Sequence, residues 1–138
     1  RSAAEKDEVP VGAVVVYKGK IIGRGHNQVE GLKDPTAHAE MIALTSAANY
    51  LGNKWLLGAV VYATIEPCSM CAGALVLSRV KGLVYGASDP KTGACGSVHN
   101  IANNKRFNHR IQVKKGLLEE ECGALLREFF KKKRFNRK

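Results

Sequence analysis

The chain has 138 residues, of which 45% are hydrophobic, and it carries 22 Lys and Arg against 12 Asp and Glu, a formal net charge of +10. This length and apolar content suffice for a core that needs no disulfide bonds, so we expect residues 1–138 to form a single domain. No apolar run has the length of a membrane span, and residues 1–8 lack the apolar centre of a signal peptide, which favours a cytoplasmic protein without a membrane partner.

The first predicted elements are two strands joined by a tight turn. Residues 11–17 and 20–25 are rich in β-branched side chains, and the Lys18-Gly19 pair between them is typical of a β-hairpin. Residues 28–34 are mixed and polar, which predicts a loop.

The next predicted element is a helix that begins after Asp34-Pro35-Thr36. His38 and Glu40 lie at its start. Its apolar side chains recur at helical spacing, and they are Met41, Leu44, Ala48 and Leu51.

The second half of the chain alternates strands with helices. Residues 59–65 predict a strand that leads through Pro67 into a buried helix over residues 68–78. Short strands are predicted at 83–85 and 111–113. A final amphipathic helix is marked by Leu118, Cys122, Leu125, Leu126 and Phe129. This alternation predicts an α/β protein in which helices cover the faces of a mixed sheet.

Two short motifs carry the clearest chemical signal: His-Ala-Glu at residues 38–40 and Glu-Pro-Cys-Ser-Met-Cys at residues 66–71. One histidine and two cysteines occupy three positions of a tetrahedral zinc ion and leave the fourth to water, as in catalytic rather than structural sites. His38, Cys68 and Cys71 are therefore the candidate ligands of one zinc ion per chain, and Glu40 is the candidate catalytic proton carrier.

The spacing of the motifs explains how they serve one metal. Cys68 and Cys71 follow Pro67, and proline favours the first helical position, so both sulfurs are expected at the opening turn of one helix. His38 and Glu40 are separated by about 200° around a helix of about 3.6 residues per turn, so the metal must lie beyond the helix end. There His38 binds the metal while Glu40 reaches its water.

Three other interpretations of the motifs remain open. In the first, His26, His99 or His109 joins His38 in a closed Cys2His2 site, although no pair of these histidines has zinc-finger spacing. In the second, the two cysteines form a redox pair, which leaves His38 and Glu40 without a role. In the third, His38 is a core residue and Glu40 interacts with the helix dipole.

Positive charge is concentrated in two segments, residues 105–110 and 131–138. The first interleaves its cations with aromatic and amide side chains, and the second closes the final helix. Cations at the end of a helix stabilise its dipole, but this effect does not account for a second, separate basic segment. We therefore expect a nucleic acid as the partner.

Longer stretches of the chain resemble known deaminases. Similarity to the cytidine-deaminase-like fold is carried by residues 9–13, 25–27, 36–41 and 66–74, and similarity to the bacterial tRNA-specific adenosine deaminases by residues 89–94, 108–110 and 117–130. The resemblance implies a three-layer α/β/α fold with a central mixed five-stranded sheet, and a homodimer. It also implies hydrolysis of the wobble adenosine to inosine in a tRNA anticodon stem-loop. Relative to this family, Ile65 replaces leucine, and residues 1–8 supply only about two turns of the first helix.

The resemblance implies the same zinc ligands and proton carrier, and it adds residues that contact the substrate. Asn27 would lie beside the flipped base. The other substrate-binding residues that it implies are Ala39, Asp89, Lys91, Asn108 and Phe130.

The chemistry and two alternative functions follow from these assignments. Zinc lowers the pKa of its bound water toward about 7, and Glu40 would move the proton to ring N1 while C6 of adenine is attacked. A deaminase of a free base or nucleotide such as guanine shares the metal motifs but has no need of a basic tail. A non-catalytic zinc protein that binds nucleic acid has no need of Glu40. RNA and single-stranded DNA are not distinguished by the sequence.

Overall fold

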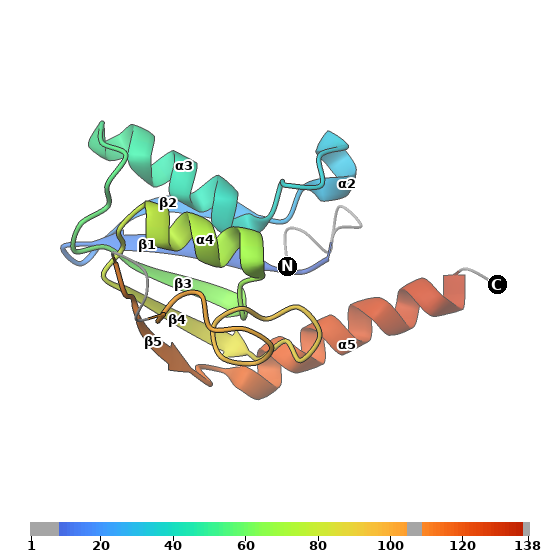
Figure 1. Cartoon of the computed structure of the whole chain (residues 1–138). Helices are drawn as coiled ribbons and strands as arrows, with labels where there is room; N and C mark the ends of the chain where they lie inside the picture. The colour runs from blue at the N-terminus through green and yellow to red at the C-terminus, as the bar shows by residue number, and fades with distance from the viewer. Residues whose placement is uncertain (1–8, 105–108, 137–138) are drawn as a thin grey trace.

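The computed structural model, which describes residues 9–104 and 109–136, is built on one five-stranded sheet (Figure 1). Its elements in chain order are β1 (Gly12–Tyr17), β2 (Lys20–His26), α2 (Val29–Leu32), α3 (Ala39–Leu51), β3 (Val60–Ile65), α4 (Ser69–Leu77), β4 (Gly82–Ala87), β5 (Gln112–Lys115) and α5 (Glu119–Asn136). The strand order is β2-β1-β3-β4-β5. Strand β1 is antiparallel to β2 and β3, whereas β3, β4 and β5 run parallel, so the predicted mixed sheet is confirmed.

Helices lie on both faces of this sheet. Helix α3 packs on β2 and β1 and contacts α4, whereas α5 packs on β4 and β3. Figure 1 shows α3 and α4 on one side of the sheet and α5 on the other, which is the expected three-layer α/β/α arrangement. Among the described residues, no helix combines the length and the apolar character that a membrane crossing requires.

The predicted hairpin between β1 and β2 is present. Lys18 and Gly19 form its turn with φ values of 49° and 74°. Two consecutive positive φ angles match the twist of the flanking strands, and glycine adopts such angles without a steric penalty. The pairing register shifts between Val15 and Val16.

Strand β2 lies very close to α3. A Cβ atom placed on Gly25 would overlap the carbonyl oxygen of Ala39 and would lie 2.8 Å from the backbone nitrogen of Ala43. Gly23 has the same relation to Ala43 and Ala47. Glycines on the strand and alanines on the helix therefore fix the first turn of α3 against the sheet.

This packing corrects the predicted apolar face of α3. Its buried residues are Ala39, Glu40, Ala43, Leu44 and Ala47. Of the four predicted positions, Leu44 is buried, whereas Met41, Ala48 and Leu51 are half-buried. Three of the predicted positions carry large side chains, but the helix face toward β2 is made of Ala39, Ala43 and Ala47, because only alanine fits where the glycines of β2 approach.

Two further predictions about helices were wrong. Burial within α4 is confined to Cys71, Ala72 and Leu75, and Leu77 is 78% exposed, because only one side of this helix packs on the protein. The predicted loop at residues 28–34 contains the short helix α2, which ends at Leu32 and is followed by Lys33 as its C-cap, with a φ of 53°.

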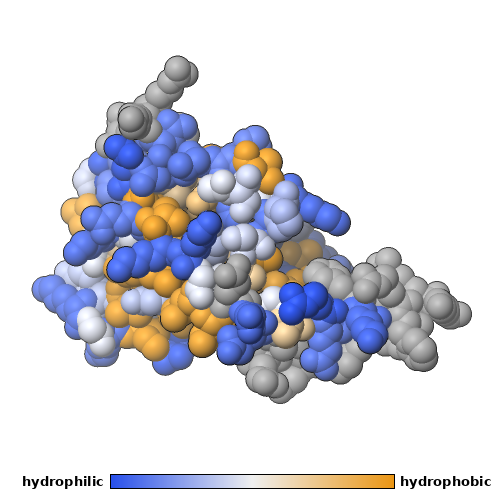
Figure 2. All heavy atoms as spheres, turned by 90° about the horizontal axis from the view of Figure 1, so that it is seen from below, coloured by the Kyte–Doolittle hydropathy of each residue, from blue (hydrophilic) through white to orange (hydrophobic). Residues whose placement is uncertain are grey.

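Strand alternation decides which side chains enter the core beneath α3 and α4. Ala13 and Val15 of β1 are buried there, so Val14 and Val16 point to the opposite face. Tyr62 of β3, which is 37% exposed, alternates in the same way with its buried neighbours. Figure 2 views the molecule from this opposite side and shows apolar side chains gathered among hydrophilic ones.

Candidate active site

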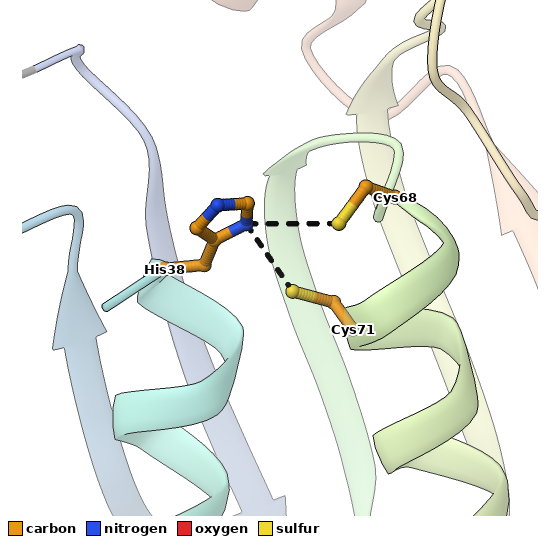
Figure 3. Close-up of side chains that lie close together, drawn as sticks. All are labelled: His38, Cys68 and Cys71. Carbon is orange, nitrogen blue, oxygen red and sulfur yellow. Dashed lines mark hydrogen bonds between the residues drawn. The ribbon is translucent and has the colours of Figure 1, made fainter. Parts of the chain in front are cut away.

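Three potential metal ligands meet where α3 and α4 begin. His38 is the N-cap of α3 and Cys68 is the N-cap of α4, and both have extended backbones. Cys71 lies in the first turn of α4. Nδ1 of His38 is 3.7 Å from Sγ of Cys68 and 3.5 Å from Sγ of Cys71 (Figure 3). Neither N-cap side chain bonds to its own helix, so both point into the space between the helices.

The helix boundaries differ slightly from the predicted ones. Helix α4 begins at Ser69, so Pro67 precedes the N-cap instead of occupying the first helical position. One sulfur therefore projects from the cap and the other from within the helix. His38 stands at the cap of α3, so its side chain and that of Glu40 leave the same helix end in different directions.

The donor set fits one tetrahedral zinc ion. Typical zinc bonds to nitrogen and sulfur place these two atoms about 3.6 Å apart at a tetrahedral angle, which the distances from His38 match. All three donor atoms lie within 4.8 Å of one another. In the described part of the chain, no fourth His, Cys, Asp or Glu joins the cluster. Three protein donors are typical of catalytic zinc sites, whereas closed structural sites have four.

Glu40 lies beside this cluster and is only 3% exposed. Burial raises the pKa of Glu40, although hydrogen bonds from its own backbone N–H and from the thiol of Cys71, and the charge of His38, act in the opposite direction. A buried carboxyl group with a raised pKa is suited to accepting and releasing a proton during a reaction.

The pKa values of the two cysteines are shifted in opposite directions. A hydrogen bond from the thiol of Cys71 lowers the pKa of Cys68 to about 5, with help from the backbone N–H of Cys71 and against the effect of burial. The same bond and burial raise the pKa of Cys71. The lowered pKa of Cys68 favours the thiolate, which is the form that binds zinc.

Two predicted substrate residues lie on the α3 side of the cluster. Asn27 follows β2 and is 9% exposed, and its side-chain oxygen accepts a hydrogen bond from the backbone of Val29 at 3.4 Å. The next backbone N–H, of Gln28, donates to the carbonyl of Ala37 at 2.9 Å, so this segment runs beside the residues that lead to His38. Ala39 is fully buried.

The other predicted substrate residues are placed differently. The carboxylate of Asp89 accepts hydrogen bonds within its own turn, from the backbones of Lys91 and Thr92 at 3.0 and 3.1 Å and from the Thr92 hydroxyl at 2.6 Å. Although burial opposes them, these bonds lower the pKa of Asp89. Lys91 is exposed at this turn. Asn108 lies outside the described residues, and Phe130 lies in α5 with only its backbone described.

Glu66, for which no role was predicted from the sequence, lies at the centre of a hydrogen-bond cluster. Glu66 follows β3 and is 2% exposed. It accepts hydrogen bonds from the backbones of Asp89, Cys95 and Ser97, and from the hydroxyl of Ser97. Despite burial, these bonds lower the pKa of Glu66. A charged residue directly after a buried strand was the available signal, because a buried carboxylate requires hydrogen-bond donors.

The described residues of the first basic segment make internal hydrogen bonds. Nε2 of His109 donates to the carbonyl of Val80 at 2.6 Å. Val80 follows the C-terminal end of α4, so this ring lies away from the metal cluster at the start of that helix. Nε of Arg110 donates to the side chain of Asn103 at 2.7 Å. Residues 105–108 lie outside the described residues.

This site and fold together define a class of proteins. A His-Cys-Cys cluster at two helix starts, with a glutamate beside it, is the arrangement of zinc-dependent nucleobase deaminases. In agreement, residues 1–134 match the family model of the MafB19-like deaminases.

Comparison with individual relatives narrows this class to one family. The tRNA-specific adenosine deaminase of Bacillus subtilis (strain 168) is 50% identical over 138 residues, covering 100% of this chain and 86% of the relative. That of Aquifex aeolicus (strain VF5) is 51% identical, covering 99% of this chain and 89% of the relative. The chain belongs to the tRNA-specific adenosine deaminase family.

Solved structures agree with the predicted fold. A tRNA deaminase studied for A-to-I editing at the wobble position of transfer RNA has a TM-score of 0.87 and 44% identity, covering 91% of both chains. The guanine deaminase of Nitrosomonas europaea has a TM-score of 0.76 and 30% identity, covering 94% of this chain and 77% of that chain. The cytidine-deaminase-like fold is therefore confirmed, and it is shared by deaminases of different bases.

Proposed function

We propose that the protein is a zinc-dependent deaminase that hydrolyses the wobble adenosine of a tRNA anticodon loop to inosine. The observation that carries this proposal is the convergence of His38, Cys68 and Cys71 beside the buried Glu40. Similarity to tRNA-specific adenosine deaminases over the full chain selects the substrate. We also propose a cytoplasmic homodimer, which follows from the family and from a tRNA substrate.

In this proposal His38, Cys68 and Cys71 hold one zinc ion. When bound by these three residues, zinc would supply an acidic water molecule, and hence a nucleophile, at neutral pH. Glu40 holds the proton that the water releases, delivers it to ring N1 of adenine, and later carries a proton to the amino group that leaves as ammonia. Water and adenosine are thereby converted to inosine and ammonia.

An anticodon loop suits a site of this kind. The base must leave its stack to reach the space between α3 and α4, and an unpaired loop makes this step less costly than a duplex does. In this proposal the side chain of Asn27, whose segment runs beside the residues that lead to His38, contacts the flipped base.

The proposed function is tested by incubating the purified protein with an anticodon stem-loop that carries a wobble adenosine. Nucleoside analysis is expected to detect inosine in the loop and no inosine in a fully paired duplex of the same composition. Guanine is incubated in parallel. Xanthine formation without inosine would instead assign the protein to free-base deamination, the activity of the Nitrosomonas relative.

The zinc assignment predicts about one zinc ion per chain in the purified protein. Cys71→Ala is expected to lose that zinc, because two donors remain, whereas Cys122→Ala in α5 keeps it. Metal analysis after gel filtration measures both variants. Full zinc content in Cys71→Ala would overturn this ligand set.

The basic end of α5 is expected to bind RNA phosphates. The helix extends away from the sheet toward the C-terminus (Figure 1). Removal of residues 131–138 should weaken stem-loop binding and flatten its salt dependence, because each lost phosphate contact reduces the logarithmic slope by about 0.7 to 0.9. Titration of labelled stem-loop at several salt concentrations measures this slope. A slope equal to that of the full chain would contradict the assignment, provided that zinc content is unchanged.

A further inference from the structure

The carboxylate of Glu66 organises a loop whose bonded residues lie 23 to 31 positions later in the chain. One oxygen accepts the backbone N–H of Asp89 at 3.0 Å and the hydroxyl of Ser97. The other oxygen accepts the backbone N–H groups of Cys95 and Ser97, each at 3.0 Å. A carboxylate has about four acceptor sites, so this buried group is fully satisfied by one loop.

The same loop lies directly against the start of α4. The backbone of Gly93 forms an antiparallel bridge with Cys68, and the N–H of Ala94 donates to the carbonyl of Pro67 at 2.9 Å. A Cβ atom on Gly93 would overlap the carboxylate of Glu66. Loop and carboxylate therefore fit together without spare room beside a candidate zinc ligand.

The part of the loop that reaches solvent carries a positive charge. Asp89 shapes the turn through its bonds to the backbones of Lys91 and Thr92, and Lys91 and Thr92 are exposed. The N–H of Asp89 is itself bound by Glu66. The position of Lys91 is thus set by a chain of contacts that begins at the buried carboxylate.

We propose that Glu66 is a positioning residue for the RNA substrate: it holds the loop of residues 89–97 at the rim of the site, so that Lys91 meets a phosphate of the anticodon loop. This inference rests on the proposed function and adds a residue that determines RNA affinity without touching RNA. The four hydrogen bonds that the Glu66 carboxylate accepts all come from this loop. The loop keeps its own bonds to Pro67 and Cys68, so the proposal separates substrate binding from metal binding and from the chemical step.

The test compares the zinc-loaded full chain with Glu66→Gln and Ser97→Ala. A glutamine side chain keeps one acceptor oxygen, but its NH₂ group would point at backbone N–H groups, which are also donors. Some loop bonds are therefore lost, and Glu66→Gln is expected to raise KM for the stem-loop by about tenfold or more. Zinc content stays at one per chain, and kcat stays within about threefold of the original value. Ser97→Ala removes one donor and leaves three, so its KM rises by a smaller factor of about threefold.

Hydrogen exchange supplies a readout that does not depend on activity. In Glu66→Gln the amide protons of Asp89, Cys95 and Ser97 are expected to exchange faster, whereas the amide of Ala72 within α4, bonded to the Cys68 carbonyl at 2.8 Å, keeps its protection. If Glu66→Gln does not fold, the KM and the amide exchange of Ser97→Ala test whether Glu66 positions the loop.

Several outcomes would overturn the inference. Loss of zinc, a fall in kcat at constant KM, or unchanged KM and exchange in a folded variant would each mean that Glu66 does not position the loop for RNA. If the original protein forms no inosine but the loop amides still depend on Glu66, the proposed function has failed, and RNA positioning fails with it. If the original protein forms inosine and the variants match it, only this inference has failed.

Discussion

Glu40→Gln is expected to lower the rate of inosine formation by at least about 10²- to 10⁴-fold, the usual contribution of a positioned proton carrier. The glutamine has the size of the glutamate and suits the same buried position, but its amide neither accepts nor returns a proton at neutral pH. The zinc donors His38, Cys68 and Cys71 are unchanged. Single-turnover assays with saturating stem-loop, together with metal analysis, measure the rate and the zinc content.

The matched control is Glu120→Gln, which makes the same chemical change at an exposed position of α5. Its rate is expected to equal that of the original protein. If Glu40→Gln keeps its zinc but loses turnover, and Glu120→Gln keeps both, then Glu40 is the residue that carries the proton. A rate within a few-fold of the original would require another group in the site to carry the proton.

The candidate site was predictable from the sequence because its chemistry is local. His38 and Glu40 leave one helix end, and Cys68 and Cys71 leave another, so two short motifs contain every proposed metal ligand and the proton carrier. What the motifs did not establish is that the two helix ends meet. That depends on strands β2 and β3, which lie on either side of β1 and both run antiparallel to it, so they end at the same edge of the sheet, where α3 and α4 begin.

Contacts between distant segments were not predictable in the same way. The bonds of Glu66 join residues 23 to 31 positions apart, and no periodic pattern signals them. Asp89 has an acidic side chain that fits an RNA-contact motif, yet the structure uses its carboxylate to shape a turn. A polar side chain in a loop can serve either purpose, and only the fold shows which donors surround it.

Small residues were also underestimated, because hydrophobic periodicity counts large side chains. Gly23 and Gly25 carry no hydrophobic signal, but their missing side chains allow α3 to approach β2. The alanines that face them are fully buried for the same reason. The position of the catalytic end of α3 thus depends on residues to which the sequence analysis assigned no packing role.

Gly25→Ala is the second substitution expected to have a large effect, because the added Cβ meets backbone atoms rather than a flexible side chain. It would overlap the Ala39 carbonyl oxygen and approach the Ala43 nitrogen. Helix α3 must then move away from β2, which costs about 1–3 kcal/mol of unfolding free energy. His38 and Glu40 move with the helix, so zinc affinity and the deamination rate should both fall. Urea unfolding, metal analysis and the stem-loop assay measure the three effects.

Gly73→Ala in α4 is the control: it makes the same substitution as Gly25→Ala, but it is expected to stabilise the protein. In the described part of the chain, no atom outside its own helix turn lies within 4 Å of a Cβ at this position. Alanine favours a helix over glycine by about 0.5–1 kcal/mol. This variant should therefore unfold at a higher urea concentration and keep its zinc, although it lies two residues from Cys71. If Gly25→Ala instead unfolds at the same concentration as the original protein, α3 tolerates the displacement, and close packing on β2 does not position the site.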